Sequence, residues 1–393
     1  MPGPLDGLLV LVLTRLLPGS FATQLLTNLG ADVIKIEEPV VGDYMRAVPP
    51  SVRGVSLPFL MVNRGKRSLA VDLKRPEGQK IFHRLAARAD VLVEQFRPGV
   101  TARLGADRPS LAKINPRLVY CSFTGYGQTG PARDWPGHDI TFEAHSGILG
   151  VTGGADGRPV VPGVPIADLA SGFNAALAIL AALRTRDRTG RGEFIDVSIF
   201  DTTVALMLLN IAHFLGAREE PSPGETILTG VFPFYNLYET EDGRWLAVGA
   251  VEGKFWRRLC ELLSLPRLAD VQFGDVEARR RVTEAVAAAF RTKTGAEWER
   301  LLASEDLPIA LVRRVSEVVE DPHVAARGLL AAADVPGGDG TRVVRHPAFH
   351  EISKISTPTR APEKGEHSEQ ILAWLGYSKA AIESLRRGRV VAP

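Results

Sequence analysis

Cysteine and net charge are both scarce in this sequence, and each shortage excludes a class of protein. Only two of the 393 residues, Cys121 and Cys260, are cysteine, so neither a disulfide framework nor a cysteine-based metal site is expected. The 47 Lys and Arg residues are nearly balanced by 45 Asp and Glu residues, whereas a nucleic-acid-binding domain carries a clustered basic excess. The sequence therefore predicts no metal and no nucleic-acid partner.

Long hydrophobic runs are also missing. The apolar stretch 8–13 has six residues and follows Asp6 instead of a basic region, which argues against a signal peptide. The most apolar segment of helix length, 199–215, contains Asp201 and His213 and is shorter than a full membrane span. We therefore expect a cytoplasmic protein with no membrane segment.

What the sequence does contain is an alternation of strands and helices. Hydrophobic residues make up 45% and charged residues 23% of the chain, as is usual for globular proteins. Apolar runs predict five strands in the first 125 residues, separated by helical patterns, at 8–13, 33–36, 68–73, 91–93 and 118–123. This alternation predicts an α/β fold with a Rossmann-like, doubly wound parallel sheet.

A second domain is indicated further along the chain. Residues 217–226 are charged and rich in Pro and Gly, which is typical of a linker. The pattern then restarts with a strand at 245–248 and with helices at 255–263, 277–290 and 296–302. We expect a smaller α+β domain there, followed from about residue 321 by a Pro-rich crossing and two short helices.

The segment 125–130 reads GYGQTG and matches the dinucleotide-binding pattern G-x-G-x-x-G after a strand. That pattern needs a helix to begin at the glycines so that its N–H groups face a pyrophosphate. Pro131 and Pro136 follow within six residues, and Pro136 would break such a helix. A loop whose backbone N–H groups approach a bound carbonyl or anion is the better interpretation.

Three polar residues lie where a parallel sheet holds ligands or where a helix begins. His138 follows the glycine loop, Asp168 lies in the first turn of an apolar helix, and Glu252 joins a strand to a helix. Each has an ordinary structural alternative: a structural histidine, a carboxylate favoured by the helix dipole, and an acid near a helix N-cap. At a helix start, Asp168 would stay ionised and would be available as a base or a nucleophile.

Basic residues follow several predicted strands of the first domain. Individually each would be an ordinary surface charge, but together, on one side of a sheet, they would suit a multiply phosphorylated ligand. They are Arg46, Arg64, Lys66, Arg67 and Arg97.

The chain resembles the family III CoA-transferases and, within them, most closely the α-methylacyl-CoA racemases. The resemblance runs nearly end to end, and its motifs are specific as a set. They are ADVIKIEEP from Ala31, NRGKRSLAVDLK from Asn63, DVLVEQFRPGV from Asp90, GYGQTGP from Gly125, GHDI from Gly137, ADLASG from Ala167, RTGRGEFIDVSIFD from Arg188, PFYNLYETEDGRWLAVGAVEGKFW from Pro233 and GEHSEQIL from Gly365.

The resemblance implies a large Rossmann-like domain formed by both termini, a smaller inserted α+β domain, and two chains interlocked as a homodimer. The corresponding layout assigns 1–216 and 321–393 to the large domain, 217–231 to a linker and 232–320 to the small domain. An acyl-CoA thioester would be the substrate, with no further cofactor. The resemblance places CoA near residues that fall into two groups, the basic residues Arg46, Lys66 and Arg97 and the glycine-loop residues Gly125, Tyr126 and Gly127.

The resemblance also implies catalytic roles for three residues. Asp168 matches the family's reactive aspartate, which in transferases attacks the thioester to form a mixed anhydride. In racemases the aspartate works with a histidine, matched by His138, and a glutamate, matched by Glu252. Racemisation needs one group to remove the α-proton and another to return a proton to the opposite face, and donors to stabilise the enolate oxygen.

Transferase chemistry would leave His138 and Glu252 without a role. The sequence therefore favours racemisation of 2-methylacyl-CoA thioesters by 1,1-proton transfer, with a CoA-transferase using Asp168 as the alternative. A non-catalytic protein that binds acyl-CoA or NAD is a third possibility.

Overall fold

The structure is a computed structural model and describes residues 3–154, 156–227, 229–335, 337–338, 340–347 and 358–392. The chain forms two compact units. The first combines Met1–Ser146, Val164–Leu206 and Pro322–Pro393, and the second combines Gly147–Gly163 and Met207–Asp321. This division groups residues 207–216, which the predicted layout assigns to the large domain, with the second unit.

The first unit is built on a seven-stranded sheet in the order β14-β5-β2-β1-β6-β7-β8. Its strands are β1 (Leu9–Leu13), β2 (Asp32–Glu37), β5 (Arg67–Val71), β6 (Val91–Glu94), β7 (Val119–Thr124), β8 (Phe194–Ser198) and β14 (Val391–Ala392). All pairs are parallel except β14 with β5. Taken in chain order, the six parallel strands lie 3-2-1-4-5-6, the order of the dinucleotide-binding fold. The predicted α/β class with a central parallel sheet is confirmed.

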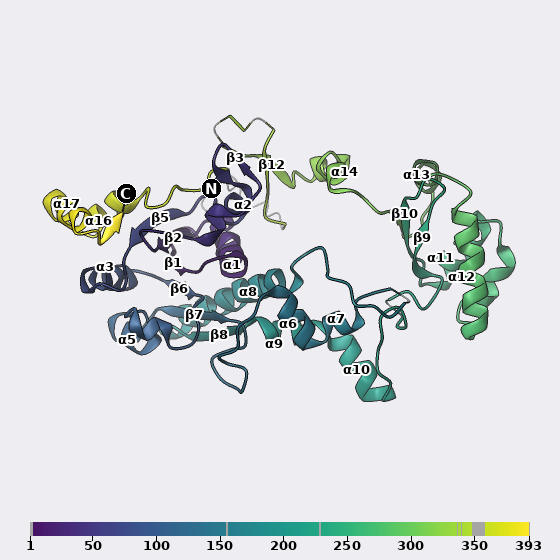
Figure 1. The fold of residues 1–393 in the computed structure, drawn as a ribbon, viewed down its shortest axis with the longest axis horizontal. Helices are drawn as coiled ribbons and strands as arrows, with labels where there is room; N and C mark the ends of the chain where they lie inside the picture. Colours follow the sequence, from purple (N-terminus) through teal and green to yellow (C-terminus); the bar gives the residue numbers. More distant parts are fainter. Residues whose placement is uncertain are drawn as a thin grey trace. The chain divides into compact units, whose positions relative to one another are not determined.

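Strand β1 shows why these segments form a buried parallel sheet. Every residue of β1 is buried, and its side chains alternate between two apolar cores: Leu11 contributes to one and Val12 to the other. Strands covered on both faces read as continuous apolar runs, because neither face meets water. The first core is completed by α3 (Pro76–Ala86), α16 (Ser368–Trp374) and α17 (Lys379–Arg387), and the second by α1 (Leu17–Asn28) and α8 (Ile166–Thr189) (Figure 1).

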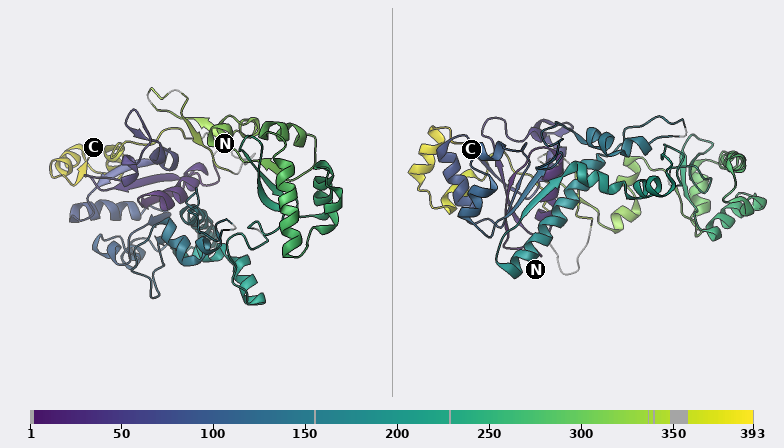
Figure 2. Two further views of the ribbon diagram at one scale, coloured as in Figure 1. Left: turned by 45° about the vertical axis from the view of Figure 1, so that its right-hand side comes forward. Right: turned by 90° about the horizontal axis from the view of Figure 1, so that it is seen from below.

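The C-terminal segment joins the sheet beside strands from the start of the chain, as two further views show (Figure 2). The His367 N–H donates to the Ser68 oxygen (3.0 Å), and β14 pairs antiparallel with β5. With only two residues, β14 carries too short a pattern to be predicted from sequence. Its pairing covers the edge of β5, which would otherwise offer free backbone groups to another chain.

The apolar segment predicted as a single helix up to Gly216 is divided at Met207 into α9 (Ile199–Leu206) and α10 (Leu208–Ala217). By length and composition alone, α8 would suffice to span a membrane, and α9 with α10 would do so only together, as a bent pair. In the structure α8 packs against α1, α6 (Asp139–Ser146) and α9, and against β7 and β8. This is the packing of a helix in a protein core.

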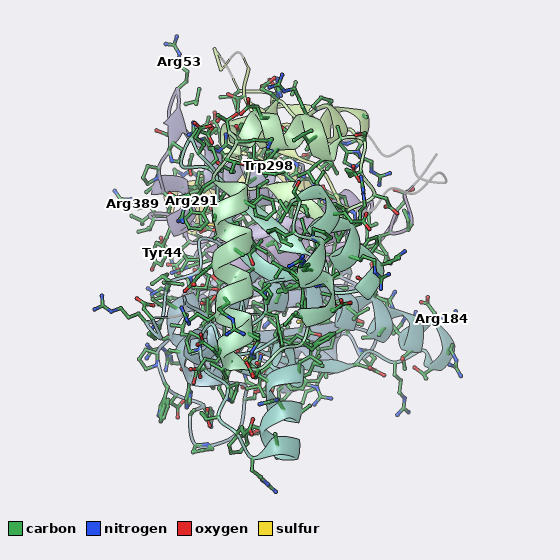
Figure 3. The ribbon with its side chains drawn as sticks, turned by 90° about the vertical axis from the view of Figure 1, so that its right-hand side faces the viewer. Tyr44, Arg53, Arg184, Arg291, Trp298 and Arg389 are labelled. Atoms are coloured by element: carbon green, nitrogen blue, oxygen red, sulfur yellow. The ribbon has the colours of Figure 1, made fainter. Side chains whose placement is uncertain are left out.

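The second unit contains a three-stranded antiparallel sheet, β11-β10-β9, formed by β9 (Tyr235–Glu239), β10 (Trp245–Gly249) and β11 (Ile309–Leu311). Helices α11 (Gly253–Leu262), α12 (Val276–Phe290) and α13 (Gly295–Leu302) contribute to its core. In α13, Trp298 (labelled in Figure 3) donates its indole N–H to the Phe290 oxygen (2.8 Å), and the two rings pack edge to face. The buried apolar residues of the second unit's core include Phe234, Trp256 and Phe290.

The remaining elements are short. They are the 3₁₀ turns η1 (Tyr44–Ala47) and η2 (Pro266–Val271), strands β3 (Ser51–Val52), β4 (Val55–Ser56), β12 (Leu330–Ala332) and β13 (Arg342–Val344), and helices α2 (Leu57–Asn63), α4 (Val100–Arg103), α5 (Arg108–Ile114), α7 (Ile148–Val151), α14 (Val315–Val319) and α15 (Pro322–Ala326).

Candidate active site

A cavity of about 260 Å³ opens at the carboxyl ends of β1, β6, β7 and β8. The strand order reverses between β1 and β6, and open α/β sheets bind ligands in the crevice at such a reversal. The polar side chains that line the cavity include Gln95, Arg97, Thr124, Arg133, His138 and Asp168. The structure thus brings together two of the three predicted catalytic residues, Asp168 and His138.

Asp168 lies in the first turn of α8. Its backbone N–H donates to Asp139 Oδ1 (3.0 Å). Burial, followed by the nearby carboxylates of Asp139 and Glu143, raises the pKa of Asp168 to about 7. The expectation that the helix N-terminus keeps this group fully ionised is therefore wrong, because burial and two acidic neighbours outweigh the helix dipole.

Asp139 and Glu143 are site residues that the sequence analysis missed. They are four residues apart on α6, so they lie on the same helix face. The Ile166 N–H donates to Glu143 Oε1 (3.2 Å). The N-cap residue of α8, Pro165, forms no side-chain capping bond. These two carboxyls therefore accept from the backbone N–H groups of the first turn of α8. An Asp four residues before a Glu, directly after His138, was the available signal.

His138 is exposed in the turn that precedes α6. Its backbone is fixed by Thr141, because the His138 N–H donates to Thr141 Oγ1 (2.9 Å) and that hydroxyl donates to the His138 oxygen (2.7 Å). Glu252 belongs to the second unit, where it is exposed and precedes α11 as its N-cap residue without a side-chain capping bond.

The glycine loop does not begin a helix, in agreement with the argument from its prolines: helix α6 begins at Asp139. Packing against the Phe142 ring explains why two positions near this loop are glycine. A Cβ on Gly125 would lie 2.8 Å from the Phe142 ring, and one on Gly137 would lie 2.5 Å from it. Tyr126 is buried in the same aromatic cluster, and Gly127 has φ +83°. The loop therefore closes one wall of the cavity with backbone instead of side chains.

Glu94 shapes the loop that carries Gln95 and Arg97. The Ser122 hydroxyl donates to Glu94 Oε1, and the Phe96 N–H donates to Oε2 (2.9 Å). Burial raises the pKa of Glu94 to about 7. Gln95 presents a buried Oε1 atom without a hydrogen-bond partner among the described residues, so the cavity contains an unsatisfied polar group. The sequence analysis assigned no role to either residue.

Leu16, another residue of this cavity wall, has φ +64°. This left-handed conformation is strained for leucine. The Leu16 N–H donates to Asp43 Oδ1 (3.1 Å), and Asp43 is itself ion-paired with Lys35 (2.6 Å) inside the protein. Such outliers persist where the surroundings enforce them, and they concentrate at functional sites.

Comparisons with known proteins identify the family of this chain. The family model described as CoA-transferase family III matches residues 5–368. The chain belongs to this family. It is similar to the succinyl-CoA:glutarate CoA-transferase of Mus musculus (37% identical, covering 97% of this chain and 89% of the relative) and to the alpha-methylacyl-CoA racemase of Homo sapiens (33% identical, 98% and 97%). A solved CAIB/BAIF family protein from Brucella suis superimposes with a TM-score of 0.84 (32% identical, covering 95% and 100%).

These relatives bear on the choice between two chemistries. The family contains both transferases and racemases, and succinyl-CoA:glutarate CoA-transferases match this chain more closely than the racemase does. The comparisons therefore favour the transferase alternative over the racemase that the sequence analysis put first. They establish the family but no specific activity.

The basic residues predicted to hold CoA phosphates have different surroundings. Arg97 lines the cavity, is exposed, and its guanidinium has no ion-pair partner in the described part of the chain. Arg46 forms two hydrogen bonds to the Glu37 carboxylate (2.6 and 2.8 Å) and lies over the Phe59 ring. Buried Lys66 lies between α1 and α2, where Nζ has four oxygen partners within 3.0 Å for its three protons: the Ser20 oxygen, Thr23 Oγ1, the Val62 oxygen and Asn63 Oδ1. In this structure Lys66 has no donor left for a phosphate.

A second cavity of about 530 Å³ adjoins the ends of β1, β2, β5 and β6, and Phe96 lines both cavities. Its cationic residues are Arg15, Lys74 and Arg103. Three acids also line it: Glu37, Glu38 and Asp72. Glu37 is bonded to Arg46, Glu38 accepts from two backbone N–H groups, and Asp72 Oδ1 accepts from the Lys74 N–H (2.9 Å). The first unit therefore has two adjoining cavities at the carboxyl edge of one sheet.

The second unit has the largest of the three cavities, about 750 Å³. It lies against β9, β10 and β11, and glycines and small or apolar residues make up most of its described lining. None of these described residues is Asp, Glu, His, Lys, Arg or Cys. Apart from the hydroxyls of Thr229 and Tyr235, its described lining offers shape and apolar contact but no group for acid–base or nucleophilic chemistry.

Proposed function

We propose that this protein is a CoA-transferase that moves CoA from an acyl-CoA to a free carboxylic acid, with the Asp168 carboxylate as nucleophile. The observation that carries the proposal is a half-buried carboxylate that lines the cavity at the strand reversal and forms no salt bridge among the described residues. Its pKa of about 7 reflects burial and acidic neighbours. A carboxylate that is hard to ionise is a stronger nucleophile than an ordinary aspartate.

The proposed steps balance without a further cofactor. An Asp168 oxygen attacks the thioester carbonyl, the C–S bond breaks, and the acyl group forms a mixed anhydride while CoA leaves as a thiolate. The thiolate then attacks the Asp168 carbonyl, which releases the first acid and leaves an aspartyl thioester. The second acid then attacks the aspartyl thioester, which releases the CoA thiolate and forms a second mixed anhydride. The thiolate attacks the acyl carbonyl of that anhydride, which yields the new acyl-CoA and regenerates the Asp168 carboxylate.

We infer that CoA lies across the two adjoining cavities of the first unit. The thioester would occupy the cavity of Asp168, with Arg97 near the phosphates. Arg15, Lys74 and Arg103 in the neighbouring cavity would then contact the nucleotide end, since guanidinium and ammonium groups bind phosphate oxygens. Arg46 and Lys66, whose hydrogen-bond donors are engaged inside the fold, would stabilise the walls of this site.

A small dicarboxylic acid is the acceptor that we propose. Succinate and glutarate, the acids named for the similar mouse transferase, both carry a second carboxylate. Arg133 lines the cavity, and its nearest acidic partner is the adjacent Asp134 at 3.9 Å. An arginine that is so weakly paired is available to bind the second carboxylate while the first reacts at Asp168.

Racemisation of a 2-methylacyl-CoA stays the second candidate, because one observation favours it. His138 lies in the same cavity as Asp168, as a two-base mechanism requires. The Glu252 that would support the histidine lies in the other unit, so its part in such a mechanism remains a prediction.

Two parallel incubations in D₂O distinguish the candidates. The enzyme is mixed with succinyl-CoA and ¹³C-labelled glutarate, and in parallel with 2-methylacyl-CoA. The proposal predicts ¹³C-glutaryl-CoA in the first reaction and no α-deuterium in the second. Deuterium at the α-carbon without CoA transfer would replace the proposal with a racemase, and the absence of both would leave a binding protein.

We also propose that the chain forms a homodimer. Apolar side chains are exposed on α8, at Phe173 and Leu177, and on α10, at Leu208, Leu209 and Leu215. Patches of this kind mark association surfaces. The resemblance adds that the two chains interlock. Sedimentation should give twice the chain mass, whereas a monomer at micromolar concentration would contradict the proposal.

A further inference from the structure

The start of α8 is held by another helix. Among its first N–H groups, Ile166 donates to Glu143 Oε1 (3.2 Å) and Asp168 donates to Asp139 Oδ1 (3.0 Å), while the Ala167 N–H also bonds to the Glu143 carboxyl. Two acids one turn apart on α6 therefore do for α8 what an N-cap side chain does elsewhere. Through these bonds, the position of Asp168 depends on α6.

The second oxygen of Glu143 indicates where a proton lies. Glu143 is fully buried, and its Oε2 has no hydrogen-bond partner if every carboxyl is treated as ionised. The Asp139 carboxyl lies within hydrogen-bonding reach of Glu143. Two carboxyls bond to each other only when one of them is protonated, and like charges this close do not both ionise in a protein interior.

Neither a cation nor a metal takes the place of that proton. No salt bridge involves Glu143, Asp139 or Asp168 in the part of the chain that the structure describes. Within that same part, no three His, Cys, Asp or Glu side chains form a group suited to a metal ion. Helix α9 also packs against α6, and its one acidic residue, Asp201, is exposed.

We propose that Glu143 is a positioning residue: its protonated carboxyl donates to Asp139 and accepts from the first turn of α8, which holds Asp168 in place for attack on the thioester. Glu143 is the more buried of the two acids and supplies this proton, while Asp139 Oδ1 accepts the Asp168 N–H. This inference rests on the proposed role of Asp168 as nucleophile.

The arrangement has a consequence for protonation. A neutral Glu143 places one negative charge fewer beside Asp168 than an ionised Glu143 would. Replacing the protonated acid by the isosteric amide should then change little. In the Glu143→Gln variant, the amide N–H₂ would donate to Asp139 and the amide oxygen would accept from the Ile166 N–H.

The test compares Glu143→Gln with Glu143→Leu, and uses Asp201→Asn, an exposed acid on the neighbouring helix, as a matched control. Steady-state CoA transfer is measured from pH 5.5 to 9, and amide hydrogen exchange of residues 166–168 is measured on the whole chain without substrate. We expect Glu143→Gln to keep kcat within about 3-fold of the unaltered enzyme, with the midpoint of kcat/KM at the same pH as in that enzyme. Glu143→Leu should lower kcat by about 100-fold with little change in KM, since small displacements of a reacting group are this costly. It should also speed exchange at 166–168.

Two results would overturn the inference. If Glu143→Gln moved the midpoint down by about one pH unit, the native glutamate would be ionised. If Glu143→Leu matched the unaltered enzyme in kcat and in exchange, Glu143 would position nothing; should this variant not fold, the midpoint of Glu143→Gln decides. Absence of CoA transfer in the unaltered enzyme would refute the proposed function instead, and the exchange measurement would still test the capping of α8.

Discussion

Two groups of acids lie at the carboxyl edge of the same sheet, and they have opposite electrostatics. Glu37 and Asp43 are buried beside cations, Arg46 and Lys35 respectively, at 2.6 Å. Although burial alone would raise them, these partners hold the pKa values of Glu37 and Asp43 below their usual range. Asp168, with no cation beside it among the described residues, has its pKa raised to about 7, first by burial.

The contrast shows that burial alone does not decide what an acid does. Where a cation is built in, the carboxylate is permanently ionised and serves as a structural anchor: Asp43 holds Leu16 in its strained conformation, and Glu37 fixes Arg46. Where no cation is built in, the pKa of the carboxyl is raised towards neutral pH, and the group is more reactive when it ionises. The four predictions below change one group at a time, from the largest expected effect to the smallest.

Removing the reactive acid should have the largest effect. Asp168→Ala should lower the rate of CoA transfer by about 10⁴-fold, because no other group replaces a lost nucleophile. Turnover of succinyl-CoA with glutarate measures this, and Asp201→Asn serves as the control that should stay active. A variant with a tenth of the normal rate would remove Asp168 from the centre of the mechanism.

Removing the cation of the paired group should damage stability. Lys35→Met leaves Asp43 buried without its partner, which should lower the free energy of unfolding by about 3–5 kcal/mol. Urea denaturation followed by circular dichroism measures this. The double variant Lys35→Met, Asp43→Asn should recover part of the loss, since no charge is then left buried. A loss below about 1 kcal/mol for the single variant would show that this pair is not a structural anchor.

Neutralising the unpaired acid should instead stabilise the protein in a pH-dependent way. The pKa of Asp168 is about 7 in the folded chain against an ordinary value of 3.8. Its favourable contribution is thus complete below pH 4 and is lost as the pH rises through 7. Asp168→Asn should therefore gain about 2–4 kcal/mol in unfolding free energy at pH 8 and almost nothing at pH 4. An equal effect at both pH values would mean that the raised pKa is absent.

The smallest effect concerns the strain beside the cavity. Because Leu16 has φ +64°, glycine should tolerate the position better than alanine, although both remove the same side chain. We expect Leu16→Gly to be about 1 kcal/mol more stable than Leu16→Ala. Thermal unfolding of the two variants measures the difference. If alanine proved equally stable, Asp43 would not be enforcing a strained backbone.

Much of the fold was predictable because buried parallel strands leave a strong pattern. The apolar runs at 8–13, 91–93 and 118–123 correspond to β1, β6 and β7 within one or two residues. The strand order depends on contacts between distant segments and leaves no such pattern. The same is true of β14, whose pairing with β5 joins residues more than three hundred positions apart.

The site was predictable only in part, for a related reason. Asp168 and His138 stand at a helix start and after a strand, which the sequence displays. The bond from the Ile166 N–H to Glu143 joins residues 23 positions apart, and a pair of acids one turn apart reads equally well as a solvated helix face. Lys66 shows the reverse error: a lysine after a loop reads as a phosphate contact, yet its Nζ is enclosed by four oxygen partners.

The measurement that tests the central claim most directly is chemical trapping of Asp168 during turnover. The enzyme is mixed with succinyl-CoA and then treated with sodium borohydride, which reduces an aspartyl thioester or anhydride to homoserine but leaves a free carboxylate intact. Peptide mass spectrometry should find homoserine at position 168 only when acyl-CoA is present. An unchanged Asp168 in an enzyme that is transferring CoA would contradict the account.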